Sequence, residues 1–134
     1  MGPLDILTPG SLCDLPDAHR YPERIAYCNR AVDTTLKDDV FKEYRLAGFR
    51  LNPRHRSQYK IDHLIPLCAG GSNRENNLWP QHMSIFERTD GLESLGCTKL
   101  KAGKIKQAAL VKLILAAKKD LKLVTKTMKQ LERL

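Results

Sequence analysis

The chain has 134 residues, of which 42% are hydrophobic and 28% are charged, and its formal net charge is +8. This length suits one domain with its own hydrophobic core. No apolar run approaches about 18 residues, which excludes a transmembrane helix and gives no reason to expect a membrane partner.

The N-terminal half is predicted to be irregular first and helical afterwards. Residues 1–20 contain several Pro and Asp residues and are expected to form an irregular arm. Pro22 suits the first turn of a helix that would run to about Arg30. After Asp33, apolar side chains recur every three or four residues, which predicts a second helix that Gly48 ends.

The middle of the chain predicts a β-hairpin followed by a helix. Tyr59–His63 is the first strand, and the second strand lies in the stretch after Gly71. The helix is expected over residues 83–95, with an early stop or a kink at Gly91. Asn77 is expected near the mouth of this helix, as a turn or cap residue.

The C-terminal segment, 99–134, predicts a long basic helix. It contains eleven Lys and Arg against two Asp and Glu, so its charge is +9, whereas residues 1–98 have a charge of −1. Unbroken, the helix would be about 50 Å long. Either it breaks near Lys118–Asp120 and packs back on the core, or it projects and forms a homodimer through its apolar stripe. That stripe consists of Ile114, Ala117, Leu121, Val124, Met128 and Leu131.

The excess positive charge points to a polyanionic partner, because Lys and Arg release counterions from phosphates. A Lys-rich helix taken alone is more often a solvated surface. The choice between these interpretations therefore depends on the chemistry elsewhere in the chain.

The four cysteines form no Cys-x-x-Cys pair, so a zinc knuckle is not indicated. Disulfides Cys13–Cys28 and Cys68–Cys97 would staple the N-terminal arm and tie the hairpin to its helix. Three connectivities exist, and free buried thiols in a cytoplasmic protein are an equal alternative. Disulfides would indicate an oxidising compartment, so a periplasmic or secreted protein is favoured.

The most informative pattern is the Asp62-His63 pair at the end of the first hairpin strand. A Pro66 break and a Gly70-Gly71 turn follow it. A carboxylate beside an imidazole can hold a divalent cation and supply a base within a few ångströms of it. These two groups are the minimum for metal-assisted hydrolysis of a phosphodiester.

Asp-His-x-x-Pro-Leu-x-x-Gly-Gly-x-Asn, followed by Asn-Leu-Trp-Pro-Gln, resembles the HNH endonucleases over roughly residues 59–95. The resemblance implies an α+β fold, in which a ββα-metal (His-Me finger) hairpin-helix unit is embedded in a largely helical small domain. It implies that His63 is the general base and Asp62 a metal ligand. It also implies that Asn77 braces the loop joining the second strand to the helix.

The predicted helix departs from the family pattern, because no His or Asn stands where the second metal ligand is expected. Its available oxygen donors are Asp90, which is preferred, and Glu87, and His82 lies earlier. The expected metal is Mg²⁺, with Mn²⁺, Ca²⁺ or Zn²⁺ as alternatives. Trp79 is expected in the core.

Basic side chains near the motif are candidates for contacts with the substrate. Arg54, Arg56 and Lys60 are expected to bind flanking phosphates, and Arg88 could reach the transition-state charge. The predicted function is therefore a metal-dependent endonuclease of low sequence specificity, with DNA favoured over RNA as partner. The alternatives are a nucleic-acid-binding module without catalysis and a toxin or effector nuclease controlled by a protein inhibitor.

Overall fold

The computed structural model describes residues 2–51 and 53–134, and this part of the chain is a mixed α+β protein. Strands β1 (Ala18–Arg20) and β2 (Ile25–Tyr27) form one antiparallel pair, and β3 (Tyr59–His63) and β4 (Leu78–His82) form another. The helices are α1 (Thr34–Leu46), α2 (Met83–Lys101), α3 (Gln107–Lys119) and α4 (Val124–Glu132). The predicted α+β class is confirmed. None of the described helices combines the length and apolar character that a membrane span requires.

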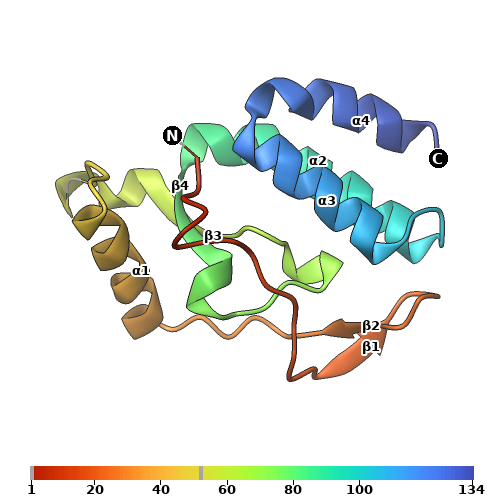
Figure 1. Ribbon diagram of the computed structural model, residues 1–134, viewed down its shortest axis with the longest axis horizontal. Coiled ribbons are helices and arrows are strands. Elements are labelled where there is room, and N and C mark those ends of the chain that lie inside the picture. Colours follow the sequence, from red (N-terminus) through yellow and green to blue (C-terminus); the bar gives the residue numbers. More distant parts are fainter. Residues whose placement is uncertain (1, 52) are drawn as a thin grey trace.

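The β3–β4 hairpin lies between two hydrophobic cores. Helices α2, α3 and α4 lie together on one side of the molecule, and α1 lies at the other end (Figure 1). The first core joins α2, α3 and α4, and the second joins α1 to the hairpin through Val40, Tyr44, Ile61 and Trp79. The hairpin belongs to the second core, and α3 reaches it through Leu115. The prediction that Trp79 is a core residue is confirmed.

The predicted helix from Pro22 to Arg30 is wrong, because this segment contains the turn and the second strand of the β1–β2 hairpin. Tyr21 and Arg24 have φ angles of 68° and 61°, and the Arg24 amide donates to the Tyr21 carbonyl at 2.9 Å. Pro22 thus occupies the second position of a tight turn, a position that its fixed φ suits as well as a helix start. The strand Ala18–Arg20 likewise replaces part of the predicted irregular arm.

Helix α1 and strand β3 are where the sequence predicts them. The Asp33 side chain accepts the Leu36 amide at 2.8 Å and caps α1. Helix α2 begins at Met83 as predicted but passes through Gly91 without a stop and continues to Lys101. Beyond Gly91 the helix packs closely on α3, because Gly96 lies so near Leu110 that an added Cβ would stand 2.6 Å from its side chain.

The C-terminal segment breaks where the sequence allowed it to break. Asp120, with φ −138° and ψ 96°, ends α3, and its side chain accepts the Lys122 amide before α4 begins. The apolar stripe is used within the molecule, since Ile114, Ala117 and Leu131 are buried between α2, α3 and α4. The segment thus follows the first alternative, a break with packing back on the core, and the stripe that the homodimer alternative would use is largely taken up within the molecule.

Both predicted disulfides, Cys13–Cys28 and Cys68–Cys97, are formed. The first ties the N-terminal arm to the end of the β1–β2 hairpin. The second ties the loop between β3 and β4 to α2. Two disulfides are compatible with a periplasmic or extracellular protein.

Replacing both Cys68 and Cys97 by Ala is expected to lower the free energy of unfolding by about 3–4 kcal/mol, because the bond closes a long loop in the unfolded chain. The residues are 29 apart in sequence. Urea denaturation of the double variant measures the loss. The Cys13→Ala/Cys28→Ala variant, whose cysteines are 15 residues apart in sequence, should lose slightly less free energy of unfolding. Unchanged midpoints in both pairs would refute this role.

Candidate active site

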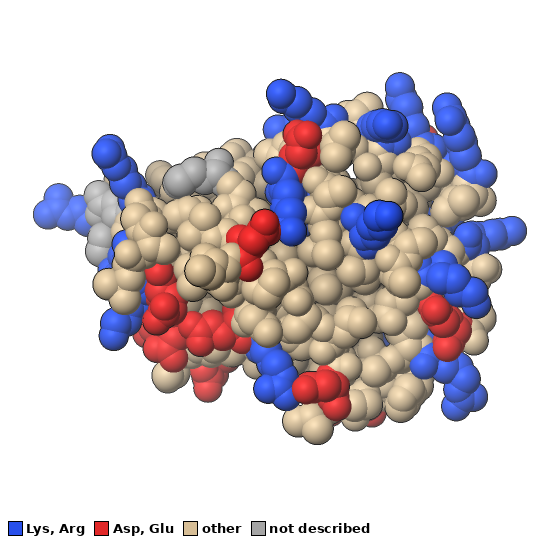
Figure 2. Space-filling model, in the orientation of Figure 1, with Lys and Arg blue, Asp and Glu red and all other residues tan. Residues whose placement is uncertain are grey.

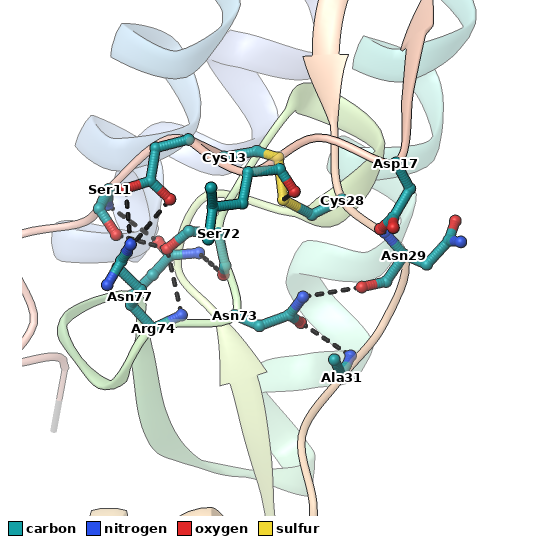
Figure 3. The surroundings of a disulfide bond; sticks show 12 residues. Ser11, Cys13, Asp17, Cys28, Asn29, Ala31, Ser72, Asn73, Arg74 and Asn77 are labelled. Carbon is teal, nitrogen blue, oxygen red and sulfur yellow. Dashed lines mark hydrogen bonds and ion pairs between the residues drawn. A yellow bond between two sulfur atoms is a disulfide. The ribbon is translucent and has the colours of Figure 1, made fainter.

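His63 is the last residue of β3, and a side-chain amide orients its ring. Nε2 lies 3.0 Å from Oδ1 of Asn73. Asn73 Nδ2 donates to the Asn29 carbonyl at 2.7 Å, and Oδ1 accepts the Ala31 amide at 3.1 Å (Figure 3). Because these backbone partners fix which atom of the amide is the oxygen, Nε2 must be the donor. The proton of neutral His63 is therefore on Nε2, and Nδ1 has the free lone pair.

The environment of His63 keeps this imidazole neutral. Burial lowers its pKa below 6.5, and the charges of Arg30 and Lys118 act in the same direction, against the Asn73 hydrogen bond and the Asp62 charge. Within the described residues, the His63 side chain has its hydrogen bond through Nε2, and Nδ1 is not sealed from solvent. Nδ1 is thus a neutral base that water can reach.

Asn77 closes the loop between the two strands. Its Oδ1 accepts the Ile65 amide at 2.9 Å, and its Nδ2 donates to the Ile65 and Ser72 carbonyls at 3.0 and 2.8 Å. Its own carbonyl accepts the amide of Leu64, the residue after His63. The predicted bracing role holds for a different loop, because Asn77 precedes β4 and joins β3 to β4 instead of β4 to α2. It likewise does not stand at the mouth of α2, because it ends the 3₁₀ helix Glu75–Asn77 and β4 follows it.

Asp62 belongs to a buried charge cluster on the other face of β3. Its Oδ2 accepts from Trp79 Nε1 at 2.9 Å and from Lys118 Nζ at 2.8 Å. Lys118 also donates to the His63 carbonyl at 2.9 Å and forms an ion pair with Glu93 of α2. Burial lowers the pKa of Lys118, but the charges of Asp62 and Glu93 outweigh this effect and keep the ammonium protonated. Burial raises the pKa of Glu93 to about 7.

The predicted metal ligands are not brought together. Glu87 and Asp90 are exposed on α2, and the helix carboxylate that meets the Asp62 cluster is Glu93. In residues 2–51 and 53–134, no three His, Cys, Asp or Glu residues are placed to hold a metal ion. Charges of +1 and +2 about 4 Å apart repel by roughly 8 kcal/mol at an effective dielectric constant of about 20. With Lys118 on Asp62, these residues do not fit Mg²⁺.

A basic cleft of about 270 Å³ lies beside β3, where Lys60 and Ile61 line it and His63 does not. Ile61, two residues before His63 on the same face of β3, lines it. The cationic side chains that line it come from four separate segments, namely Arg30, Lys37, Arg56 and Lys60.

Two of the four cations already have partners. Arg56 pairs with Asp38, and the Lys60 ammonium lies 3.4 Å from the centre of the Phe86 ring. The side chains of Arg30 and Lys37 have no hydrogen bond or ion pair within the described residues. The cleft therefore presents two uncompensated charges, one of which acts on His63.

The remaining predicted residues lie elsewhere or have other roles. Arg54 is exposed in the 3₁₀ helix Pro53–Gln58 and does not line the cleft. Arg88 donates to the Leu121 carbonyl at the junction of α3 and α4, so its predicted catalytic role is not supported. His82 caps α2, where its Nδ1 accepts the Ser84 amide. The Lys and Arg side chains over α3 and α4 stand apart from one another and form no continuous basic surface on the face drawn in Figure 2.

The site thus combines the predicted His63 with residues that the sequence did not single out for a role. Asn73 fixes the tautomer, the charge of Arg30 acts on the base, and Lys118 bridges Asp62 and Glu93. Comparisons with protein-family models, with curated proteins and with solved structures gave no match to this chain.

Proposed function

We propose that this chain is a phosphodiesterase that hydrolyses nucleic-acid strands, with His63 as the general base. The observation that carries the proposal is the His63–Asn73 pair, which leaves Nδ1 neutral, oriented and open to water. The order of elements supports the HNH resemblance, since an antiparallel hairpin leads directly into α2 and His63 ends its first strand. The finer assignment to a ββα-metal unit is part of this proposal.

In the proposed reaction, a nucleic-acid strand binds with a backbone phosphate in the basic cleft, and the scissile phosphate reaches His63, two residues after the lining Ile61. Nδ1 removes a proton from water, and the resulting hydroxide attacks phosphorus in line with the 3′ oxygen. The P–O3′ bond breaks, and the 3′ oxygen takes up a proton from solvent. The products carry a 5′ phosphate and a 3′ hydroxyl. Arg30 and Lys37 stabilise the charge on the phosphate oxygens.

Recognition in this mechanism is electrostatic and does not depend on base sequence. Phosphate contacts position a nucleic acid without reading its bases. DNA is the first substrate to test, with RNA beside it. The two disulfides support a role outside the cytoplasm. Control by a protein inhibitor stays a prediction.

One observation favours a second candidate, a nucleic-acid-binding module without catalysis. Glu87 and Asp90 do not join Asp62, and a Lys ammonium stands on that carboxylate instead. Such a module would bind strands through the same cleft and leave them intact. Cleavage assays separate the two candidates.

The proposal is tested by incubating the protein with labelled DNA and RNA and comparing the Arg30→Gln/Lys37→Gln variant. We expect the wild type to cleave at least one polymer and the double variant to raise KM. The double variant should also bind with a weaker dependence on salt, because each lost phosphate contact lowers the slope of log K against log salt concentration by about 1. Lys126→Gln/Lys129→Gln on α4 is the matched control and should leave both unchanged. Equal effects from both pairs would remove the cleft from substrate binding.

Asn73→Ala is expected to release the tautomer of His63, whereas Asn73→Asp should keep Nε2 protonated because a carboxylate also accepts a hydrogen bond. The ¹⁵N chemical shifts of the His63 ring measure this directly. The wild type and Asn73→Asp should show a pyrrole-type Nε2, and Asn73→Ala a mixture of tautomers. Identical shifts in all three proteins would contradict a positioning role for Asn73.

A further inference from the structure

We propose that the Lys118 ammonium is the resident cation of the Asp62 cluster, in the place where the HNH resemblance implies a divalent metal. Asp62 then binds no divalent ion in the folded protein. The inference rests on the proposed function for its mechanistic meaning, since a phosphodiesterase of this kind would work without a metal on Asp62. The geometry that carries it is independent of any activity.

Three oxygen partners surround the Lys118 ammonium. Nζ lies 2.8 Å from Asp62 Oδ2 and 2.9 Å from the His63 carbonyl, and it forms an ion pair with Glu93. Two of the three N–H donors of the ammonium thus have hydrogen-bond acceptors, and Glu93 supplies a third oxygen as an ion-pair partner. The Lys118 side chain has no exposed surface. A charge buried in this way is held in place by its partners and is not exchanged with solvent ions.

The Asp62 carboxylate is engaged as well. Trp79 Nε1 donates to the same Oδ2 that Lys118 contacts. A divalent ion would have to displace the ammonium or share the carboxylate with it, and like charges at such separations repel strongly. Lys118 thus pairs with a carboxylate on each side, Asp62 from β3 and Glu93 from α2. The cation of this cluster is one that the chain supplies itself.

Lys118 is a positioning residue under this proposal. It reaches from the end of α3 to the carbonyl of His63. The ammonium therefore connects the C-terminal helices to the strand that presents the base. It does not line the basic cleft.

Terbium luminescence tests the assignment without any activity. Trp79 is the single tryptophan of the chain, and its indole bonds to Asp62. A Tb³⁺ ion on Asp62 would be sensitised by this indole at short range. We expect no saturable Tb³⁺ emission from the wild type and a saturable gain in Lys118→Ala that Asp62→Asn then abolishes. Lys119→Ala, which removes the neighbouring exposed lysine, should behave as the wild type.

Saturable emission from the wild type that disappears in Asp62→Asn would overturn the proposal, and this comparison decides even if Lys118→Ala does not fold. A folded Lys118→Ala variant without the gain would overturn it too. Failure of the proposed function looks different. In that case the wild type cleaves no nucleic acid, while its lack of Tb³⁺ emission still supports Lys118 as the cation.

Discussion

Replacing Asp62 by Ala is expected to lower the free energy of unfolding by about 3–5 kcal/mol, the cost of breaking a buried ion pair. The variant leaves the Lys118 ammonium with less compensating charge and the Trp79 indole N–H without its acceptor. Both groups are buried, so water cannot replace the lost oxygen. Urea denaturation followed by Trp79 fluorescence measures the change.

Asp38→Ala is the matched control for this prediction. It breaks the ion pair with Arg56, in which both side chains are about half exposed, and exposed pairs contribute about 0–1 kcal/mol. Adding Lys118→Met to Asp62→Ala should recover part of the loss, because the uncompensated charge is removed with its partner. Equal losses for Asp62→Ala and Asp38→Ala would show that the buried cluster does not stabilise the fold.

The elements that could be predicted have signals within their own residues. The α1 pattern begins at an Asp cap and ends before a glycine with φ of 101°, and Tyr59–His63 is a short run of strand-forming residues. The β1–β2 hairpin was missed because Pro22 suits a helix start and a turn equally. Only the pairing of residues on either side of the turn distinguishes the two structures.

The α2 carboxylate that joins the Asp62 cluster could have been predicted from which residues share the buried face of the helix. Leu92, Gly96 and Leu100 mark the buried face of α2, and Glu93 lies next to it, whereas Glu87 and Asp90 lie on the opposite side. The HNH resemblance instead implies a ligand in the first turns of the helix, where Glu87 and Asp90 lie. Periodicity along the whole helix would have indicated Glu93.

The partners of Asp62 and His63 could not be predicted, because they depend on tertiary contacts. Lys118 is 56 residues from Asp62 and stands in a Lys-rich segment, where only its position four residues after Ile114 marks it as buried. Asn73 is part of the motif, but the backbone groups that orient its amide come from Asn29 and Ala31, 44 and 42 residues away. A single sequence carries no signal for such contacts.

His63→Ala is expected to lower the single-turnover rate of cleavage by about 10²–10⁴-fold, the usual loss when a general base is removed. Binding to nucleic acid should persist, because the cleft cations are unchanged. The wild-type rate should hold above pH 7 and fall as the pH drops through the His63 pKa, which lies below 6.5. Protonation there occupies the Nδ1 lone pair. His55→Ala, which removes a histidine in the 3₁₀ helix before β3, is the control and should leave the rate unchanged.

The most direct measurement is the conversion of supercoiled plasmid to nicked circles by the wild type and by His63→Ala, side by side, with a parallel assay on labelled RNA. The account predicts that the wild type nicks DNA or cuts RNA and leaves 5′ phosphates. The folded His63→Ala protein should bind the same strands and leave them intact. Wild-type protein that cleaves neither polymer, or a His63→Ala variant that cleaves as fast as the wild type, would contradict it.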